Sequence, residues 1–386
     1  GVKETVIVRT NAREIRCTPN HPLLTNNRWV EAGEIRPGDL VGVAKKTAFG
    51  SNQMDEREID MLAIWLAEGA GYRISNGTPE IMALVGKFIA QFDGLKVVKE
   101  RGVDHVITNG DRTGGSQAGS KNPLRQMLES HGVWGLNSKS KRIPSAVFEL
   151  PEPQLARFLN VFMACDGNIS RRSKNTWAIE VQLANKAMIK QIAALFAKFG
   201  IRGQIRQKIH KAKSKRTGLP FESWRFIVSD SKSVMTFAEK IGCLSKEDAV
   251  KQAAAAAAES RGNSNVYLPI TYESLVPHLS YETSDVGKFG GYNATLERGM
   301  PTELRDLMKS WRKQSQHRIS CARYEKLRGF TDGFFDPLAD GDVAWEEVIS
   351  VESAELVQTY DLSLKDNHNF IANGIVTHNT QLAKSS

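Results

Sequence analysis

The stretch IANGIVTHNT, Ile371–Thr380, decides the fold of this chain. Its Asn373-Gly374 pair is a strong signal for a tight turn, because both residue types tolerate positive φ. The pattern predicts a strand, a turn and a strand, the last of which carries the His378-Asn379 pair to its end. Upstream, leucines alternate with polar residues and predict a half-buried strand over 360–364.

The His378-Asn379 pair, followed by Thr380, has the parts needed to break a peptide bond without a protease. The side-chain amide of Asn379 can attack its own main-chain carbonyl and close a five-membered succinimide. His378 can protonate the departing amine or polarise the carbonyl, and Thr380 offers a hydroxyl for acyl transfer. Because this tripeptide also occurs by chance, the surrounding pattern has to carry the argument.

That surrounding pattern resembles the C-terminal splicing motifs of inteins. The resemblance implies that Asp361 and His368 are the supporting acid and histidine, His378 the penultimate histidine, and Asn379 the cyclising asparagine. Thr380 would then be the first residue of the downstream extein. The alternatives are an ordinary β-hairpin with stray histidines, or a hedgehog-type autoprocessing module. The second does not explain Asn379, since such modules need no cyclising asparagine.

The N-terminal stretch IRCTPNHPLLT, residues 15–25, resembles the second intein motif, Thr-x-x-His. In that family Thr18 and His21 would polarise the amide upstream of the first nucleophile. An amide is a poor acyl donor and needs such activation. Taken alone, His21 would favour interpretation as a capping or turn histidine between two prolines; the C-terminal motifs favour the catalytic role.

The first intein motif is not found. The family opens on a Cys or Ser nucleophile several tens of residues before Thr-x-x-His, whereas this sequence begins at Gly1. Cys17 is no substitute, because it lies inside the second motif. We therefore expect either a split intein or a truncated sequence, with a missing N-terminal intein fragment as partner. Cyclisation of Asn379 does not need that fragment.

The middle of the chain holds an imperfect repeat of two apolar helices, predicted over 60–69 and 158–167. Each ends in an acid followed by glycine, at Glu68 and Asp166, and each carries small residues four apart on one face. Two such helices can approach closely and bring both carboxylates together. Paired carboxylates can bind a divalent metal that helps to cut a phosphodiester.

The repeat resembles the paired motifs of LAGLIDADG homing endonucleases, which commonly lie within inteins. The resemblance implies that Glu68 and Asp166 bind Mg²⁺ or Mn²⁺, while splicing needs no cofactor. Lys141, in the run KRIP, matches the Lys-x-Ile-Pro motif, and Lys208 is the predicted equivalent in the second half. Glu68 departs from the usual Asp, so a catalytically dead nuclease that acts only as a DNA-binding or structural insertion is the alternative.

The net charge of +9 points to a polyanion, and with the nuclease resemblance to a double-stranded DNA target. The alternative is that the basic runs are solvated faces. The predicted phosphate contacts are Lys139, Arg142, Arg171, Arg172, Lys174, Arg202, Arg206, Lys208, Lys211, Lys213, Lys215 and Arg216.

Size and cysteine usage bound the remaining possibilities. A chain of 386 residues has room for two or three domains, and it contains neither a membrane-length apolar run nor a signal-peptide pattern. Its four scattered cysteines argue against a zinc site or a disulfide scaffold, and favour the cytoplasm.

The expected architecture is a β-rich intein splicing (Hint) domain interrupted by an α+β LAGLIDADG endonuclease domain with a pseudo-two-fold repeat. The predicted helical region 261–340 would be either a DNA-contacting subdomain or a spacer. The tail TQLAK resembles the residues after Gly-Lys in a P-loop, which suggests a P-loop ATPase as host. The predicted boundaries are 1–50 and 341–379 for splicing, 51–260 for the nuclease, and 380–386 for the extein.

Overall fold

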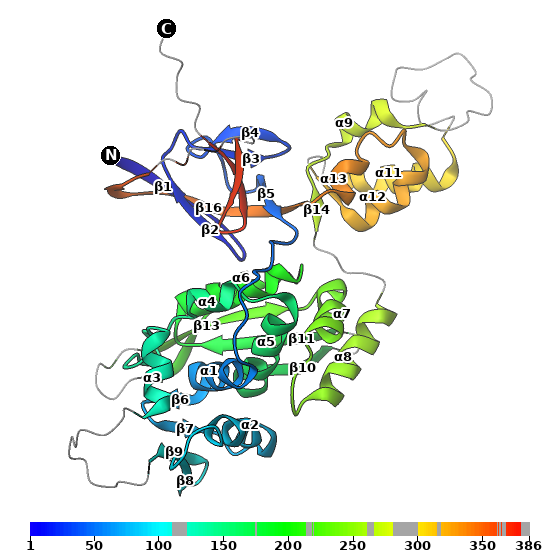
Figure 1. Ribbon diagram of the computed structural model, residues 1–386. Helices are drawn as coiled ribbons and strands as arrows, with labels where there is room; N and C mark the ends of the chain where they lie inside the picture. Colours follow the sequence, from blue (N-terminus) through cyan, green and yellow to red (C-terminus); the bar gives the residue numbers. More distant parts are fainter. Residues whose placement is uncertain are drawn as a thin grey trace, which may run out of the picture. The chain divides into compact units, whose positions relative to one another are not determined.

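The computed structural model divides into two compact units (Figure 1). The terminal unit combines Gly1–Lys45 with Gly262–Ser386, and the central unit is Lys46–Arg261. The structure describes residues 1–109, 122–173, 176–213, 218, 220–260, 266–280, 300–314, 318–360, 362, 364 and 368–379.

The terminal unit is built on one antiparallel sheet to which both ends of the chain contribute strands, drawn in blue and red in Figure 1. The strand order is β17-β18-β3-β5-β16-β1-β2, and β4 pairs with β3. The strands are β1 (Val2–Thr10), β2 (Glu14–Cys17), β3 (Pro22–Thr25), β4 (Arg28–Glu31), β5 (Leu40–Ala44), β16 (Val343–Gln358), β17 (Asn369–Ala372) and β18 (Ile375–His378).

The C-terminal hairpin forms where the sequence predicts it. β17 and β18 are joined by Asn373 and Gly374, with φ of 51° and 80°, which confirms the tight turn. The prediction of a half-buried strand over 360–364 is wrong for the residues described there. Leu362 and Leu364 lie outside any strand, and Leu362 is 54% exposed. β16 pairs along β1 and ends at Gln358, so the sheet does not extend to these leucines.

Between the two stretches of sequence that form the sheet, the described residues 266–280, 300–314 and 318–340 form a small helical module around Trp311 and Tyr324. Leu40 of β5 and Trp345 of β16 belong to the same apolar cluster, so the module is continuous with the sheet. The described part of the region predicted to be helical does contain helices. The elements are β14 (Tyr267–Leu268), α9 (Tyr272–Leu275), η1 (Val276–His278), α11 (Thr302–Gln314), β15 (Ile319–Ser320), α12 (Cys321–Leu327), η2 (Arg328–Phe330) and α13 (Asp336–Asp340).

The central unit repeats one arrangement twice. Its first half contains α1 (Glu56–Glu68), β6 (Gly69–Ala70), β7 (Arg73–Ser75), α2 (Pro79–Ile89), β8 (Lys96–Arg101), β9 (Asp104–Thr108), α3 (Pro123–Ser130) and α4 (Ser145–Phe148). Its second half contains α5 (Glu152–Asp166), β10 (Gly167–Ser173), β11 (Thr176–Leu183), α6 (Lys186–Lys198), β12 (Gln204–Lys213), β13 (Pro220–Val228), α7 (Ser231–Lys240) and α8 (Glu247–Glu259). The sheet orders, β6-β7-β9-β8 and β10-β11-β13-β12, correspond strand for strand.

Helices α1 and α5 pack against each other in the middle of the central unit, and both end at a glycine that must be a glycine. A Cβ on Gly69 would overlap the Trp65 ring, and one on Gly167 would lie 2.5 Å from the carbonyl oxygen of Met163. The chain therefore leaves each helix directly after an acidic residue. Within the described part of the chain, no helix is long and apolar enough to cross a bilayer.

Candidate functional site

Thr18 and His21 lie in the turn that joins β2 to β3. The main-chain N–H of His21 donates to the carbonyl of Thr18 at 3.0 Å, which closes the turn. The half-buried His21 ring contacts the hydroxyl of Thr377 through Nε2, and Phe370 packs against it edge to face. Both contacts come from the C-terminal hairpin, so the two motifs predicted at opposite ends of the sequence meet in the sheet.

The end of β18 places His378 and His368 around the Asn379 backbone. The N–H of Asn379 donates to the carbonyl of His368 at 2.6 Å. Nδ1 of His378 lies 2.5 Å from the main-chain oxygen of Asn379. The His368 and His378 rings are 5.7 Å apart, and Trp29 packs edge to face on His378 at 5.0 Å. A donor at His378 Nδ1 is thus aimed at the carbonyl that succinimide closure must attack.

The side chain of Asn379 is partly buried, and its Oδ1 has no hydrogen-bond partner among the described residues. Asp361 and Thr380, the other two predicted members of this site, lie outside the described residues. Cys17 has a thiol whose pKa burial raises to about 12, so it is poorly suited to act as a nucleophile near neutral pH.

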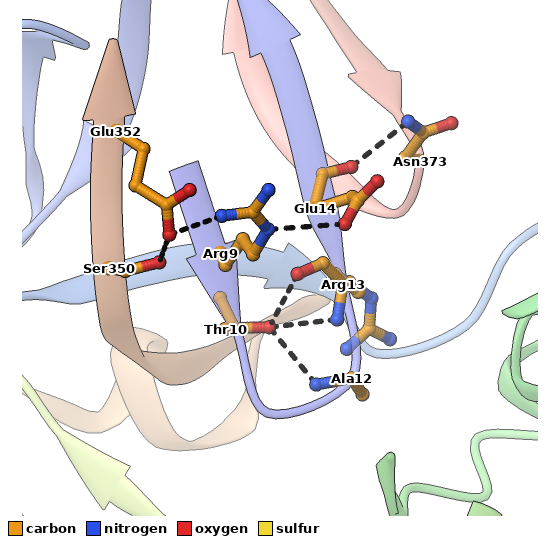
Figure 2. A network of polar contacts seen from close by, with 8 residues as sticks. All are labelled: Arg9, Thr10, Ala12, Arg13, Glu14, Ser350, Glu352 and Asn373. Carbon is orange, nitrogen blue, oxygen red and sulfur yellow. Dashed lines mark hydrogen bonds and ion pairs between the residues drawn. The ribbon is translucent and has the colours of Figure 1, made fainter. Parts of the chain in front are cut away.

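A network of ion pairs fixes the N-terminal hairpin to the strands around it (Figure 2). Arg9 of β1 lies between Glu352 of β16, at 2.5 Å, and Glu14 of β2, at 3.4 Å. The side-chain amide of Asn373 donates to the carbonyl of Glu14 at 3.0 Å. The turn of the C-terminal hairpin is therefore attached to β2, and Arg13 forms a further ion pair with Glu346.

Comparison with known proteins agrees with the geometry at the ends of the chain. A family model for the intein splicing domain matches residues 2–379. The chain belongs to the intein splicing domain family. The β-rich splicing fold expected from the sequence is thereby confirmed.

The relatives of this intein are proteins of DNA metabolism. It is 25% identical to the replicative DNA helicase DnaB of Rhodothermus marinus, over 98% of this chain and 40% of the helicase. It is 22% identical to a DNA gyrase subunit of Mycobacterium kansasii, over 99% of this chain and 67% of that protein. The replication factor C small subunit of Methanocaldococcus jannaschii is 26% identical over 60% of this chain and 12% of its own. The intein spans less than half of the length of the helicase.

The central unit of the intein places Glu68 and Asp166 at the ends of the packed helices α1 and α5. The pKa of Asp166 is raised to about 7, first by burial and second by the negative charge of Glu68, while Lys141 and Lys246 oppose the shift. Burial likewise raises the pKa of Glu68, which accepts a hydrogen bond from Asn76 at 3.2 Å. The two carboxylates are therefore close enough to repel each other, as the repeat predicts.

Each carboxylate has a lysine beside it that is held in the same way. Nζ of Lys141 donates to the carbonyls of Trp65, Leu66 and Gly69 at 2.7–3.0 Å. Nζ of Lys246 donates to the carbonyls of Met163, Ala164 and Gly167 at 2.6–3.1 Å. These carbonyls occupy corresponding positions in α1 and α5.

The second-half equivalent of Lys141 is therefore Lys246. The prediction of Lys208 was wrong, because Lys208 lies within β12, opposite Ser223 in the sheet, and it is Lys246 whose ammonium binds the end of α5. Lys246 was missed because its neighbours, Ser245 and Glu247, lack the Ile-Pro that marks the first motif.

Some of the predicted phosphate contacts share one face of the second sheet. Arg206 and Lys208 are exposed and lie two residues apart in β12, so they share one face. Arg206 pairs with Arg225 of β13. Arg172 forms an ion pair with Glu180, which also lies 3.6 Å from Arg225.

The other predicted contacts lie elsewhere or cannot be placed. Lys139 and Arg142 precede α4 in an exposed turn, Arg171 and Lys211 are exposed within strands, and Arg202 is half-buried before β12. The following lie outside the described residues, or have side chains that do: Lys174, Lys213, Lys215 and Arg216.

Proposed function

We propose that this intein splices through the residues grouped at the end of β18. The amide nitrogen of Asn379 attacks its own main-chain carbonyl carbon, the bond to Thr380 breaks, and the departing amine takes up a proton. His378 Nδ1, 2.5 Å from the carbonyl oxygen, stabilises the charge that develops there. That contact is the single observation that carries the assignment. His368 fixes the scissile segment through its carbonyl.

The earlier steps are assigned by the same logic. Thr18 and His21 activate the upstream amide, and the acyl group passes to Thr380 before Asn379 cyclises. We assign no residue of this sequence as the first nucleophile, and propose that an N-terminal intein segment supplies it. Asp361 would support the second junction, as the family resemblance implies.

Release of residues 380–386, followed by mass spectrometry, tests the proposal. Asn379→Ala should abolish release, and His378→Ala should slow it by roughly 10²-fold or more, because positioned proton donors contribute about that much. Asn369→Ala, an exposed amide in the same hairpin, is the control and should cleave at the normal rate. Undiminished release from Asn379→Ala would exclude this mechanism.

We also propose that the central unit is a LAGLIDADG-type homing endonuclease. Its support is the doubled strand order, the acids Glu68 and Asp166 at the two helix ends, and the lysines Lys141 and Lys246 that bind corresponding carbonyls there. Within the described residues no three His, Cys, Asp or Glu side chains gather as a metal cluster. Two carboxylates are nonetheless sufficient for Mg²⁺, which completes its coordination with water and substrate phosphates. When bound, the metal would neutralise phosphate charge and activate water.

Incubation with a DNA carrying the uninterrupted host site tests the endonuclease. With Mg²⁺ we expect a double-strand cut that Glu68→Gln and Asp166→Asn abolish, while Glu239→Gln, an exposed acid, leaves it unchanged. Binding without cutting, unaffected by either acid variant, would favour the alternative of a DNA-binding or structural insertion.

A P-loop ATPase remains our proposal for the host, based on the tail TQLAK. Relatives that include a replicative helicase support an enzyme of DNA replication, but the presence of a gyrase in the same group broadens the choice. Sequencing the host upstream of the intein decides it, since the proposal requires Gly-x-x-x-x-Gly-Lys there.

A further inference from the structure

Thr377 is a fully buried polar residue between the two splicing motifs, and neither motif gives it a role. Its exposed fraction is 0%. Its hydroxyl donates to the main-chain oxygen of Pro22 at 3.2 Å, and the same hydroxyl oxygen contacts Nε2 of His21. Its backbone pairs with Leu23, the next residue of β3. Buried hydroxyls persist where their hydrogen bonds are satisfied, and Thr377 uses both of its capacities.

The hydrogen count of this group fixes the direction of the contact with His21. A threonine hydroxyl has one proton to donate, and a carbonyl oxygen can only accept. In the arrangement in which the proton of Thr377 goes to Pro22, Nε2 of His21 is the donor. The His21 ring then carries hydrogen at Nε2, and Nδ1 is the nitrogen that takes up and releases a proton.

We propose that Thr377 is a positioning residue of the splicing reaction, which holds His21 in the Nε2–H form and so directs proton exchange through Nδ1. This rests on the role proposed above for His21. The neutral ring takes up at Nδ1 the proton that the first nucleophile loses as it attacks the upstream carbonyl, and becomes imidazolium. It then donates that proton to the amide nitrogen as the C–N bond breaks and the acyl group passes to the nucleophile, and the ring returns to the Nε2–H form.

The same contact links the two splice junctions. Thr377 lies one residue before His378, and Phe370, its partner across the hairpin, packs edge to face on the His21 ring. Folding of the hairpin that presents Asn379 against β3 therefore supplies the Thr377 and Phe370 contacts that hold the His21 ring. Chemistry at the upstream junction depends in this way on the order of the downstream one.

The test is the ring nitrogen spectrum of His21 in the full chain, labelled with ¹⁵N-histidine and carrying Asn379→Ala so that it stays intact. At pH 8, where the usual histidine pKa leaves the ring neutral, we expect a pyrrole-type shift at Nε2 and a pyridine-type shift at Nδ1. The reverse pattern in this otherwise unaltered chain would overturn the proposal without any change at Thr377.

Variants then assign the effect to the hydroxyl. Thr377→Val keeps the shape of the side chain and should shift the tautomer ratio about fivefold toward Nδ1–H, as expected for the loss of one hydrogen bond. Thr377→Ser should retain the original ratio. The matched control is Thr25→Val, because Thr25 is 1% exposed and its hydroxyl bonds the carbonyl of Leu23 in the same sheet. An unchanged ratio in Thr377→Val, or an equal shift in Thr25→Val, would refute the proposal.

Failure of the underlying function is distinguishable from failure of this inference. A chain with Asn379 intact that never releases residues 380–386 contradicts the proposed splicing role, whatever the His21 spectrum shows. A His21 ring that is indifferent to Thr377, in a chain that does release them, contradicts only the positioning role.

Discussion

Asp166 is a largely buried carboxyl, and ionising it without a neighbouring cation costs folding free energy. Its pKa is raised from 3.8 to about 7 by burial first and by the charge of Glu68 second. Lys141 compensates this charge less well than an exposed lysine would, since burial lowers the pKa of its ammonium group to about 8. A divalent ion would relieve this repulsion, because it interacts with both carboxylates at once.

Between pH 3.8 and about 7, the folded state therefore holds a proton on Asp166 that the unfolded chain has lost. Because the folded pKa of this acid is raised, the free energy of unfolding falls as pH rises from 3.8 to about 7. The full loss persists above pH 7. Asp166→Asn removes this deficit and should stabilise the central unit at pH 8 by roughly 1–3 kcal/mol, with little effect at pH 4. Thermal unfolding of the metal-free chain at both pH values measures it. Asp248→Asn, at a 93% exposed position, should have no such pH dependence.

At this scale the sequence predicted the residues that lie inside contiguous motifs. His378 lies against the carbonyl of Asn379, and His21 contacts Thr377, the residue before His378. Thr377 and Lys246 escaped prediction for a physical reason. Their roles depend on partners distant in sequence, 356 residues away for Thr377, and no local pattern of side chains records such a contact.

Among the elements, the turn between β17 and β18 has the least freedom. Gly374 has φ of 80°, where an L-residue is strained, and a Cβ there would lie 2.5 Å from Nε of Arg13. The Asn-Gly pair revealed this turn in the sequence, because its backbone demands are local. The alternation at 360–364 predicted a strand wrongly, because a strand also needs a neighbouring strand to pair with. The sheet does not reach these residues, since β16 ends at Gln358.

Gly374→Ala should therefore slow release of residues 380–386 by about tenfold, since it displaces both the hairpin and Arg13. The control is Gly38→Ala, where φ is 98° but a Cβ would meet nothing within 4 Å. It carries a comparable backbone penalty of about 1 kcal/mol without the clash. Equal rates for the two variants would show that the contact with Arg13 is immaterial.

In the whole molecule, the terminal unit has apolar packing on both sides of β5. Val41 and Val43 belong to the core of the splicing sheet, while Leu40 belongs to the core of the helical module. Two cations among the described residues of the module are engaged close by: Arg328 with Asp336 and Asp340, and Arg318 with Glu347. These contacts favour the role of structural support over the alternative of a DNA-contacting subdomain.

Removal of one side chain between the sheet and the helical module should destabilise the terminal unit and leave the stability of the central unit unchanged. Trp345 is 4% exposed within the module core, and Trp345→Ala should destabilise the terminal unit by about 3–5 kcal/mol. Calorimetry should show the transition of the central unit unchanged, together with a loss of cleavage after Asn379. Phe334→Ala, which removes a ring that is 64% exposed, should leave both intact. A single transition that moves as a whole would contradict independent units.

The pairing of β5 with β16 has a consequence for how the gene can evolve by insertion or loss of a segment. Ala44 pairs with Val343, and the N–H of Lys45 donates to the carbonyl of Asp342 at 2.8 Å. The central unit, Lys46–Arg261, lies in the long stretch of chain that this antiparallel pair closes, like the loop of an oversized hairpin. The entropy of closing a loop grows only with the logarithm of its length, so a gene segment inserted at this point adds little to the difficulty of folding the sheet. Such a junction is a place where a mobile element can be gained, exchanged or lost while the surrounding protein keeps its shape.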